Sequence, residues 1–319
     1  MQAIVHDTYG HADVLRSRDI DRPVPRDNEV LVRVRAAGVG PDVWHMVTGT
    51  PYAIRLGIGL RAPRNPVPGW DVAGVVESAG SGVTDLKPGD EVFGTCRGSF
   101  AEYACARADR LAPKPAGLTF EQAAALPVSG VTALQALRDK ARLREGQKVL
   151  VIGASGGVGT FAVQLAAGLG AEVTGVCGPT GSDLVRSLGA AEVIDYTRHE
   201  ISGRYDAVLD IAGSRPLALL RGVLTPGGTL VIVGGEGGGQ WLGMGRQIRA
   251  HLISPFLRQR LGTFVAVTRR NDLLALKDRI EKGALAPVVD RAYTLSEAAA
   301  ALDHLTRGHP RGKIVLTVP

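Results

Sequence analysis

The residues with the clearest chemical meaning form a run that changes from apolar to glycine-rich, KVLVIGASGGVG at positions 148–159. The apolar half is typical of a buried strand, and the small residues after it let a backbone approach a phosphate closely. A helix expected at 160–168 would direct its free N–H groups at that anion. The run therefore predicts a dinucleotide site. Its pyrophosphate-binding residues are predicted to be Ala154, Ser155, Gly156, Gly157 and Val158.

A second strand is expected at 171–176, and the residue after it bears on the choice of nicotinamide. Sites that prefer NAD place an Asp or Glu there, about 20 residues past the glycines, to bind the ribose 2′-hydroxyl. This chain has Cys177, a neutral thiol that neither binds the diol strongly nor repels a 2′-phosphate. The sequence thus favours NADPH, with NADH as the alternative. Thr180, Ser182 and Arg186 are candidate phosphate contacts, although Arg186 equally fits an ordinary solvated helix position.

The chain is poor in metal-binding residues. A structural zinc usually takes four ligands, mostly thiolates, and a catalytic zinc takes about three protein ligands. The three cysteines have no CxxC spacing, and His45 with Asp42 is better explained as a partly buried histidine beside an acidic helix start. We therefore expect no metal site. So few cysteines also predict a reducing compartment, and the N-terminal residues do not resemble a signal peptide, so we expect a cytoplasmic protein.

Length and composition limit the remaining classes. A chain of 319 residues with 45% hydrophobic content can bury a large core and suggests two domains. The net charge of +6 suits anionic ligands, but the basic residues are scattered, which argues against a nucleic-acid partner. The uncharged stretch 149–171 is interrupted by glycines and is expected to form a buried strand and helix rather than a membrane span. We expect a small-molecule substrate and no stable membrane insertion.

The elements that must position these residues change character near residue 148. Before it, alternating runs at 29–35 and 71–77 predict strands of a β-rich region, and TFEQ at 119–122 predicts a capped helix that Pro127 interrupts. After it, strands expected at 193–195, 207–211 and 229–233 alternate with helices, which predicts a parallel sheet covered on both faces. The tail 312–318 is again β-like and is expected to rejoin the first region. The apolar spacing in 241–261 predicts one or two amphipathic helices. Such a segment could cover the substrate site, contact a partner subunit or rest on a membrane surface.

Seven motifs occur in order along nearly the whole chain. They are PGWDVAGVV at 68–76, KPGDEV at 87–92, LPVSGVTA at 126–133, the glycine turn, DYT at 195–197, PGG at 226–228 and RGK at 311–313. Together they resemble the medium-chain dehydrogenase/reductase superfamily, in its zinc-free quinone oxidoreductase and enoyl reductase branch. The resemblance implies an α/β fold: a Rossmann doubly wound parallel sheet at 123–268, inserted into a GroES-like β-rich catalytic domain made of 1–122 and 269–319.

The resemblance also implies roles for residues of the catalytic domain. Zinc-dependent relatives have a cysteine where this chain has Gly40 and a histidine where it has Trp70, and neither residue present here binds a metal. The resemblance assigns Asp42 to the family's Asn-Pro-x-Asp signature, in which Gly40 replaces the asparagine and Pro41 is kept. Tyr52 matches the proton-donating tyrosine of enoyl reductases, and its structural alternative is an aromatic residue that only lines the site. A protonated tyrosine is a suitable donor to the oxygen on which charge develops during hydride transfer.

The remaining site residues follow from the same resemblance. Those expected near the nicotinamide are Thr132, Val233, Gly234 and Gly235, and Tyr196 is expected near the adenosine phosphate. Trp44, Trp70 and Trp241 are expected to line the substrate pocket, although tryptophans in such places are more often core residues. A homodimer is expected through the Rossmann domain, with edge strands pairing near 263–267.

The sequence therefore predicts a zinc-independent, NADPH-dependent oxidoreductase that transfers a hydride to a quinone or an α,β-unsaturated carbonyl compound. Two alternatives remain. The first is a non-catalytic NADPH-binding regulatory or scaffold protein, which the loss of the asparagine at Gly40 keeps open. The second is a zinc-type alcohol dehydrogenase, which the missing ligands disfavour.

Overall fold

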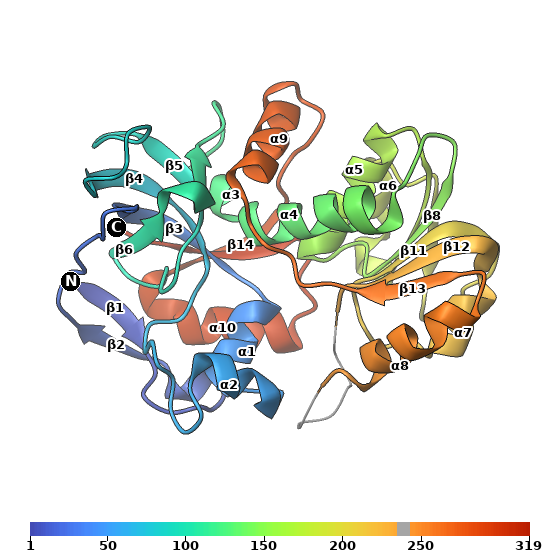
Figure 1. Cartoon of the computed structure of the whole chain (residues 1–319), viewed down its shortest axis with the longest axis horizontal. Helices are drawn as coiled ribbons and strands as arrows, with labels where there is room; N and C mark the ends of the chain where they lie inside the picture. The colour runs from blue at the N-terminus through green and yellow to red at the C-terminus, as the bar shows by residue number, and fades with distance from the viewer. Residues whose placement is uncertain (235–242) are drawn as a thin grey trace. The chain divides into compact units, whose positions relative to one another are not determined.

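The computed structural model describes residues 1–234 and 243–319, and the chain forms two compact units (Figure 1). The first consists of Met1–Val131 together with Thr268–Pro319, and the second of Thr132–Val267. The first unit is therefore built from two separate stretches of chain, whereas the second is continuous. The domain boundaries expected from the sequence, at 122/123 and 268/269, remain predictions.

The first unit is organised around a seven-stranded sheet of order β14-β15-β3-β4-β5-β7, in which β6 also pairs with β3. Its long strand β3 buries Val30, Val32 and Val34 completely, as the alternating sequence predicts. The tail rejoins this sheet as expected, because β15 pairs antiparallel with β3, with Ile314 opposite Val39. The strands of this unit are β1 (Gln2–Val5), β2 (Arg16–Asp19), β3 (Glu29–Val39), β4 (Asp71–Ala79), β5 (Glu91–Thr95), β6 (Tyr103–Arg107), β7 (Leu111–Pro113), β14 (Val289–Thr294) and β15 (Lys313–Thr317).

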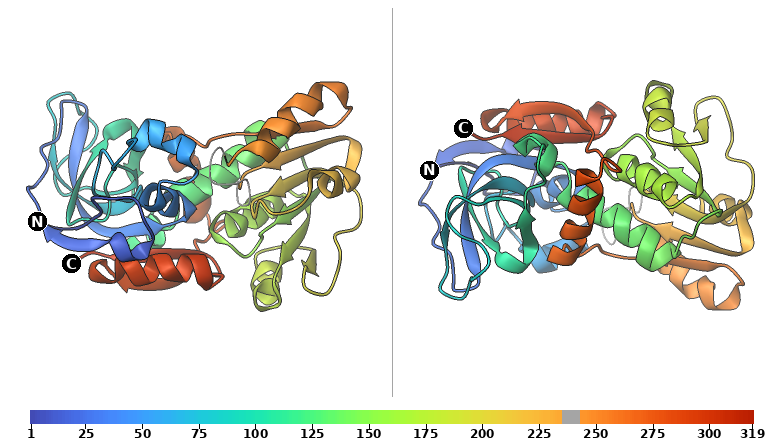
Figure 2. Two further views of the ribbon diagram at one scale, coloured as in Figure 1. Left: turned by 90° about the horizontal axis from the view of Figure 1, so that it is seen from below. Right: turned by 90° about the horizontal axis from the view of Figure 1, so that it is seen from above.

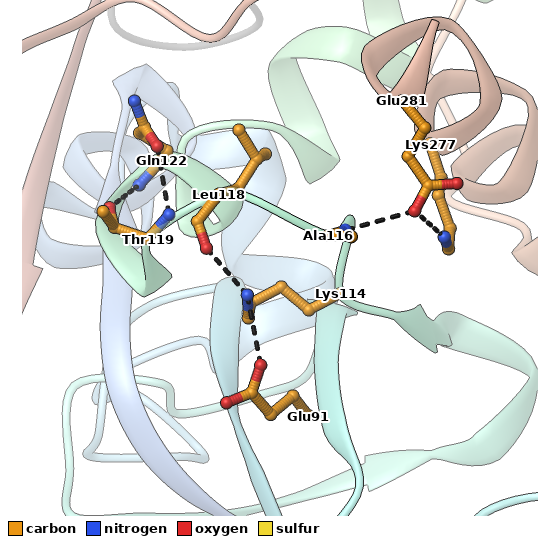
Figure 3. Close-up of polar contacts among 8 residues, drawn as sticks. All are labelled: Glu91, Lys114, Ala116, Leu118, Thr119, Gln122, Lys277 and Glu281. Atoms are coloured by element: carbon orange, nitrogen blue, oxygen red, sulfur yellow. Dashed lines mark hydrogen bonds and ion pairs between the residues drawn. The ribbon is translucent and has the colours of Figure 1, made fainter.

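The helices of the first unit include the capped one that the sequence predicts. The Thr119 hydroxyl oxygen accepts the Gln122 N–H at 3.2 Å, and the Gln122 side chain accepts the Thr119 N–H at 3.0 Å, which completes the capping box (Figure 3). Pro127 begins a new helix, so the predicted interruption is also confirmed. The helices are α1 (Pro41–Thr48), α2 (Arg55–Ile58), α3 (Phe120–Ala124), the first half of α4 (Pro127–Gln135), α9 (Arg270–Glu281) and α10 (Ala298–Arg307). The second half of α4, from Thr132, belongs to the second unit.

Polar contacts fix the returning helix α9 to the segment that follows β7 (Figure 3). The Ala116 N–H donates to Glu281 Oε1 at 3.1 Å, and Lys277 of the same helix pairs with that carboxylate. Nearby, Lys114 donates to the Leu118 carbonyl at 2.7 Å and pairs with Glu91. The hydrogen bond between Ala116 and Glu281 joins the two stretches of chain that make up the first unit.

The second unit has the parallel architecture that the sequence predicts. Its six strands follow the order β10-β9-β8-β11-β12-β13, every pair is parallel, and the strand order reverses between β8 and β11. Helices α5 and α6 cover one face and α7 and α8 the other (Figure 1). This is a doubly wound Rossmann sheet. Its elements are β8 (Lys148–Ile152), α5 (Gly157–Gly168), β9 (Glu172–Cys177), α6 (Ser182–Ser187), β10 (Glu192–Asp195), β11 (Tyr205–Asp210), α7 (Leu217–Gly222), β12 (Leu224–Ile232), α8 (Gly245–Ile253) and β13 (Arg260–Thr263).

The amphipathic helix expected within 241–261 is present as α8. Ala250 packs into the core of the second unit, whereas Leu252 and Phe256 are largely exposed. Among residues 1–234 and 243–319, no helix has the length and apolar character needed to cross a bilayer. Figure 2 shows two further views of the elements of each unit.

Candidate cofactor-binding site and catalytic residues

The glycine turn after β8 has the geometry of a phosphate-binding turn. Gly153 has φ of +85°, a conformation that glycine adopts without strain. A Cβ on Gly159 would lie 2.1 Å from the Gly153 carbonyl oxygen, so only glycine lets helix α5 approach the turn this closely. Helix α5 begins at Gly157, and Gly156, its N-cap, makes no side-chain capping bond. The first N–H groups of a helix lack intrahelical partners, so this end of α5 suits an anion.

The five residues predicted at the pyrophosphate do not all present a free donor. Ala154 is fully buried, and its N–H donates to the Val176 carbonyl at 3.0 Å. The Gly156 N–H donates to Gly153 at 3.2 Å. These two residues therefore shape the turn. Gly157 and Val158 occupy the first turn of α5 and Ser155 precedes it, so these three stay the candidates for direct contact.

The structure brings together three of the residues predicted at the adenosine end. Cys177 ends β9 with 2% of its surface exposed, and its Sγ lies 3.9 Å from Ser182 Oγ. The Tyr196 N–H donates to the Cys177 carbonyl at 3.2 Å, which holds the end of β10 beside the end of β9. A Cβ on Gly178 would lie 3.5 Å from the Tyr196 hydroxyl, so the aromatic ring faces this turn. Burial raises the pKa of the Cys177 thiol, which keeps it neutral near pH 7.

One positive charge at this end belongs to Arg215, a residue that the sequence did not reveal. Arg215 lies with its guanidinium carbon 5.7 Å from the Tyr196 ring centroid. Arg215 follows β11 and belongs to no motif that contains Tyr196, so no local sequence pattern predicts their contact. Arg186, the arginine considered from the sequence, is exposed and pairs with Asp183 of its own helix at 3.4 Å, as its structural alternative predicts. Thr180 is exposed in the connection between β9 and α6.

Val233 and Gly234, both predicted near the nicotinamide, follow β12 at the carboxyl end of that strand. The N–H groups of Val233 and Gly234 donate to the Asp210 carbonyl at 2.9 and 3.2 Å. A Cβ on Gly234 would come within 2.0 Å of the Ile211 carbonyl oxygen, so this position requires glycine. Thr132 is buried on helix α4. Gly235 and Trp241 lie outside the described residues.

In the first unit, α1 presents Asp42 and His45 in roles that need no metal. Asp42 lies in the first turn of α1, where a carboxylate complements the helix dipole. His45 Nδ1 is 2.6 Å from the Thr50 carbonyl oxygen, so that nitrogen donates to the backbone. Over the two described ranges, His, Cys, Asp and Glu side chains form no group of three or more that could hold a metal ion. Cys96, Cys105 and Cys177 are free thiols.

The sequence did not predict the buried ion pair between Lys313 and Asp71, which lies close to Asp42. Lys313, 3% exposed, places its Nζ 2.7 Å from Asp71 Oδ2 and 3.5 Å from Ser129 Oγ. The other Asp71 oxygen accepts the Val128 N–H at 2.7 Å, in the first turn of α4. Burial raises the pKa of Asp71, and the ammonium of Lys313 opposes that shift. Lys313 belongs to the RGK motif, but its partner Asp71 belongs to PGWDVAGVV, which is far away in the sequence.

Asp42 and Lys313 together explain why a glycine stands at position 40. A Cβ on Gly40 would lie 2.4 Å from Asp42 Oδ1 and 3.0 Å from Lys313 Nζ. The space that a side chain would occupy is therefore filled by this carboxylate and this ammonium. An asparagine here would displace Asp42.

The predicted aromatic residues of the first unit differ in environment. Tyr52 is 36% exposed, and the Arg55 guanidinium lies 4.6 Å from its ring centroid. Trp44 packs against the core of this unit and lines a pocket of about 270 Å³ with residues of α10. Trp70 is half-buried, and its carbonyl accepts the Cys96 N–H at 2.9 Å. Tyr52 is therefore the most exposed of the three residues.

Two family models match the chain. Residues 26–116 match the model described as "Alcohol dehydrogenase GroES-like domain", and residues 188–316 match the one described as "Zinc-binding dehydrogenase". Mouse "Quinone oxidoreductase" is 34% identical over 338 residues, covering 99% of this chain and 97% of the mouse protein. The Arabidopsis thaliana "NADPH-dependent alkenal/one oxidoreductase, chloroplastic" is 33% identical, covering 99% of this chain and 79% of the plant protein.

Solved structures give the same picture. The quinone oxidoreductase from Coxiella burnetii superposes with a TM-score of 0.88 at 30% identity, covering 100% of this chain and 99% of that one. The Escherichia coli quinone oxidoreductase complexed with NADPH superposes with a TM-score of 0.83 at 25% identity, covering 99% of this chain and all of the other.

Proposed function

The chain belongs to the medium-chain dehydrogenase/reductase superfamily, in its quinone oxidoreductase branch, and from this premise we propose that it is an NADPH-dependent reductase of quinones or α,β-unsaturated carbonyl compounds. The observation that carries the proposal is the dinucleotide turn of β8 and α5, with neutral Cys177 in the position that selects the ribose. The quinone and alkenal/one substrates and the NADPH dependence in the names of its relatives support it.

The residues present fit NADPH. Gly153 and Gly159 allow the backbone to approach a pyrophosphate closely. The N–H groups of Gly157 and Val158 are the proposed hydrogen-bond donors to that pyrophosphate. Ser182, Tyr196 and Arg215 are the proposed contacts of the 2′-phosphate, because they supply two hydroxyls and a cation around Cys177. Gly234 is proposed to pass close to the nicotinamide, as is Thr132. When bound, NADPH supplies the hydride that the reaction needs.

On the substrate side, we assign Tyr52 as the hydrogen-bond or proton donor. Reduction of a conjugated carbonyl or a quinone places negative charge on an oxygen, and a phenol stabilises that charge by donating to it. Asp42 is assigned a positioning role, since its carboxylate and the Lys313 ammonium both lie close to Gly40. Trp44 and Trp70 remain candidates for the walls of the substrate site. The proposed reaction is independent of zinc.

The test follows the oxidation of NADPH and NADH by absorbance, with a small quinone and a 2-enone offered in turn. Turnover with NADPH on either acceptor is the expected result. Tight NADPH binding without turnover on a broad acceptor panel would favour the non-catalytic NADPH-binding alternative. No binding of either nucleotide would overturn the proposal. About one zinc per purified chain would revive the zinc-type alcohol dehydrogenase.

We also propose a cytoplasmic homodimer that binds no nucleic acid. The free cysteines support a reducing compartment. Strand β13 is an edge of the parallel sheet, and Val265 just beyond it is 85% exposed, which suits pairing with the same edge of a second copy. Sedimentation of the wild type and of Val265→Asp tests the dimer. A monomeric wild type would refute it.

A further inference from the structure

A fully buried carboxylate lies at the carboxyl end of the central strand of the Rossmann sheet. Asp210, 0% exposed, ends β11, where its neighbours across the sheet are Ile152 and Ile232. Its Oδ1 accepts the Gly213 N–H at 3.1 Å. A buried charge with so little water around it requires a charged partner.

That partner is Arg246, at the start of α8. Its Nη1 lies 2.5 Å from Asp210 Oδ2, and its side chain is 18% exposed. Arg246 is in the first turn of a helix, where the dipole disfavours a positive charge. The helix dipole therefore does not account for an arginine here, whereas the buried carboxylate does.

The guanidinium also contacts the backbone of two segments already placed at the cofactor. Nη1 donates to the Arg215 carbonyl at 2.7 Å, and Nη2 donates to the Gly234 carbonyl at 3.5 Å. Arg215 is the residue whose side chain faces Tyr196 at the adenosine end. Gly234 follows β12 at the predicted nicotinamide end, and the Ile211 carbonyl leaves no space for a side chain at this position. One side chain thus joins the segments that carry the contacts of both ends of the dinucleotide.

We propose that Arg246 is a positioning residue for NADPH: held by Asp210, its planar guanidinium fixes the backbone at Arg215 and at Gly234, and so sets both affinity and preference for the 2′-phosphate. This inference rests on the proposed function, because it takes NADPH as the ligand. It assigns Arg246 no contact with the cofactor. Its effect passes through the two carbonyl groups that it holds.

The informative variant is Arg246→Lys. A lysine retains the positive charge beside Asp210 but lacks the planar fork that reaches two further carbonyl groups. We expect Arg246→Lys to keep a melting temperature close to that of the wild type. We also expect its Kd for NADPH to rise roughly tenfold, as positioning defects do. The Kd for NADH should rise less, because Arg215 acts on the 2′-phosphate that NADH lacks. Binding is read by quenching of protein fluorescence on the purified full chain, without any substrate.

Arg249→Lys is the matched control, because Arg249 is exposed on the same helix, and it should bind both nucleotides as the wild type does. Arg246→Lys with an unchanged Kd for NADPH would overturn the inference. Equal weakening of NADPH and NADH would overturn it as well, since a general structural role predicts that result. A wild type that binds no NADPH would instead be a failure of the proposed function. Arg246→Met leaves Asp210 unpaired and destabilises the fold, so the lysine variant carries the test.

Discussion

At the scale of single residues, Cys177 is the residue on which nicotinamide choice depends most. It ends β9 where an NAD-preferring site has a carboxylate, and the Ser182 hydroxyl and the Tyr196 backbone lie against it. Burial keeps the thiol neutral. The position therefore adds no charge that would oppose a 2′-phosphate.

Cys177→Asp should shift the preference toward NADH. The new carboxylate repels the 2′-phosphate and binds the free ribose diol, so the ratio of kcat/KM for NADPH to that for NADH should fall by roughly 10- to 100-fold. Steady-state kinetics with both nucleotides measure it. Cys177→Ser is the control, since it changes the side chain without adding charge, and a ratio equally lowered in the serine variant would contradict the explanation.

The substitution Tyr52→Phe distinguishes the two roles considered for Tyr52, a hydrogen-bond or proton donor and a residue that only lines the site. If the phenol donates to the developing charge, its removal should lower kcat by about 10²-fold, with little change in Kd for NADPH. Tyr9→Phe is a matched control, because Arg55 stacks on both rings and Tyr9 donates only to the Gly59 carbonyl at 2.6 Å. An unchanged kcat in Tyr52→Phe would leave the lining role as the better explanation.

At the scale of elements, two helices of the first unit depend on charged contacts with distant segments. The start of α4 is held by Asp71, which Lys313 of β15 neutralises. Helix α9 is held to the segment after β7 through Glu281. In each case a charged side chain connects residues that are far apart in the chain.

Lys313→Met should destabilise the protein by about 3–5 kcal/mol, because it leaves the Asp71 carboxylate buried without a counter-charge. Chemical denaturation measures the loss. The double variant Lys313→Met with Asp71→Asn removes both charges and should recover a large part of it. A double variant as unstable as the single one would show that packing, and not the unpaired charge, is responsible.

Glu281 should make part of the stability dependent on acid. Its hydrogen bond from Lys277, and then that from the Ala116 N–H, lower its pKa in the folded state from the ordinary value of 4.5. A lowered folded pKa means that the contribution is fully present above pH 4.5 and is lost as the pH falls through the folded value. Unfolding by urea at a series of pH values should therefore show a shallower loss below pH 4.5 in Glu281→Gln than in the wild type. Glu192→Gln, at an exposed position of β10, is the control.

At the scale of the whole molecule, a ligand that binds only the folded chain must stabilise it. NADPH at a hundred times its Kd should raise the free energy of unfolding by about 2.7 kcal/mol. Thermal unfolding with NADPH, and with NADH at equal concentration, measures this, and the smaller rise is expected for NADH. Equal shifts with both nucleotides would contradict the selectivity argued from Cys177 and Arg215.

Sequence patterns predicted those features of this molecule that depend on neighbouring residues. The strand, turn and helix around 148–168, the capping box at Thr119 and the return of β15 to the first sheet were all predictable from local pattern. The pairs Asp210 with Arg246 and Asp71 with Lys313 were not, because their partners come from separate elements. The turn motif also placed Ala154 around the pyrophosphate, which stays a prediction; the structure adds that its N–H donates to the Val176 carbonyl, a contact that the motif does not reveal.

The split composition of the first unit has a consequence for synthesis. Strand β15 lies between β14 and β3 in the interior of its sheet, yet the ribosome makes both β14 and β15 only after the whole second unit. The second unit is continuous and has all of its strands while the end of β3 at residues 36–39 still lacks the neighbour that β15 provides. Until β15 arrives, β3 presents unpaired N–H and C=O groups along part of its length, which is the form of backbone that recruits foreign strands. The first unit therefore completes its sheet after the second unit has been made, and its interval of exposure in the cell includes the whole translation of residues 132–312.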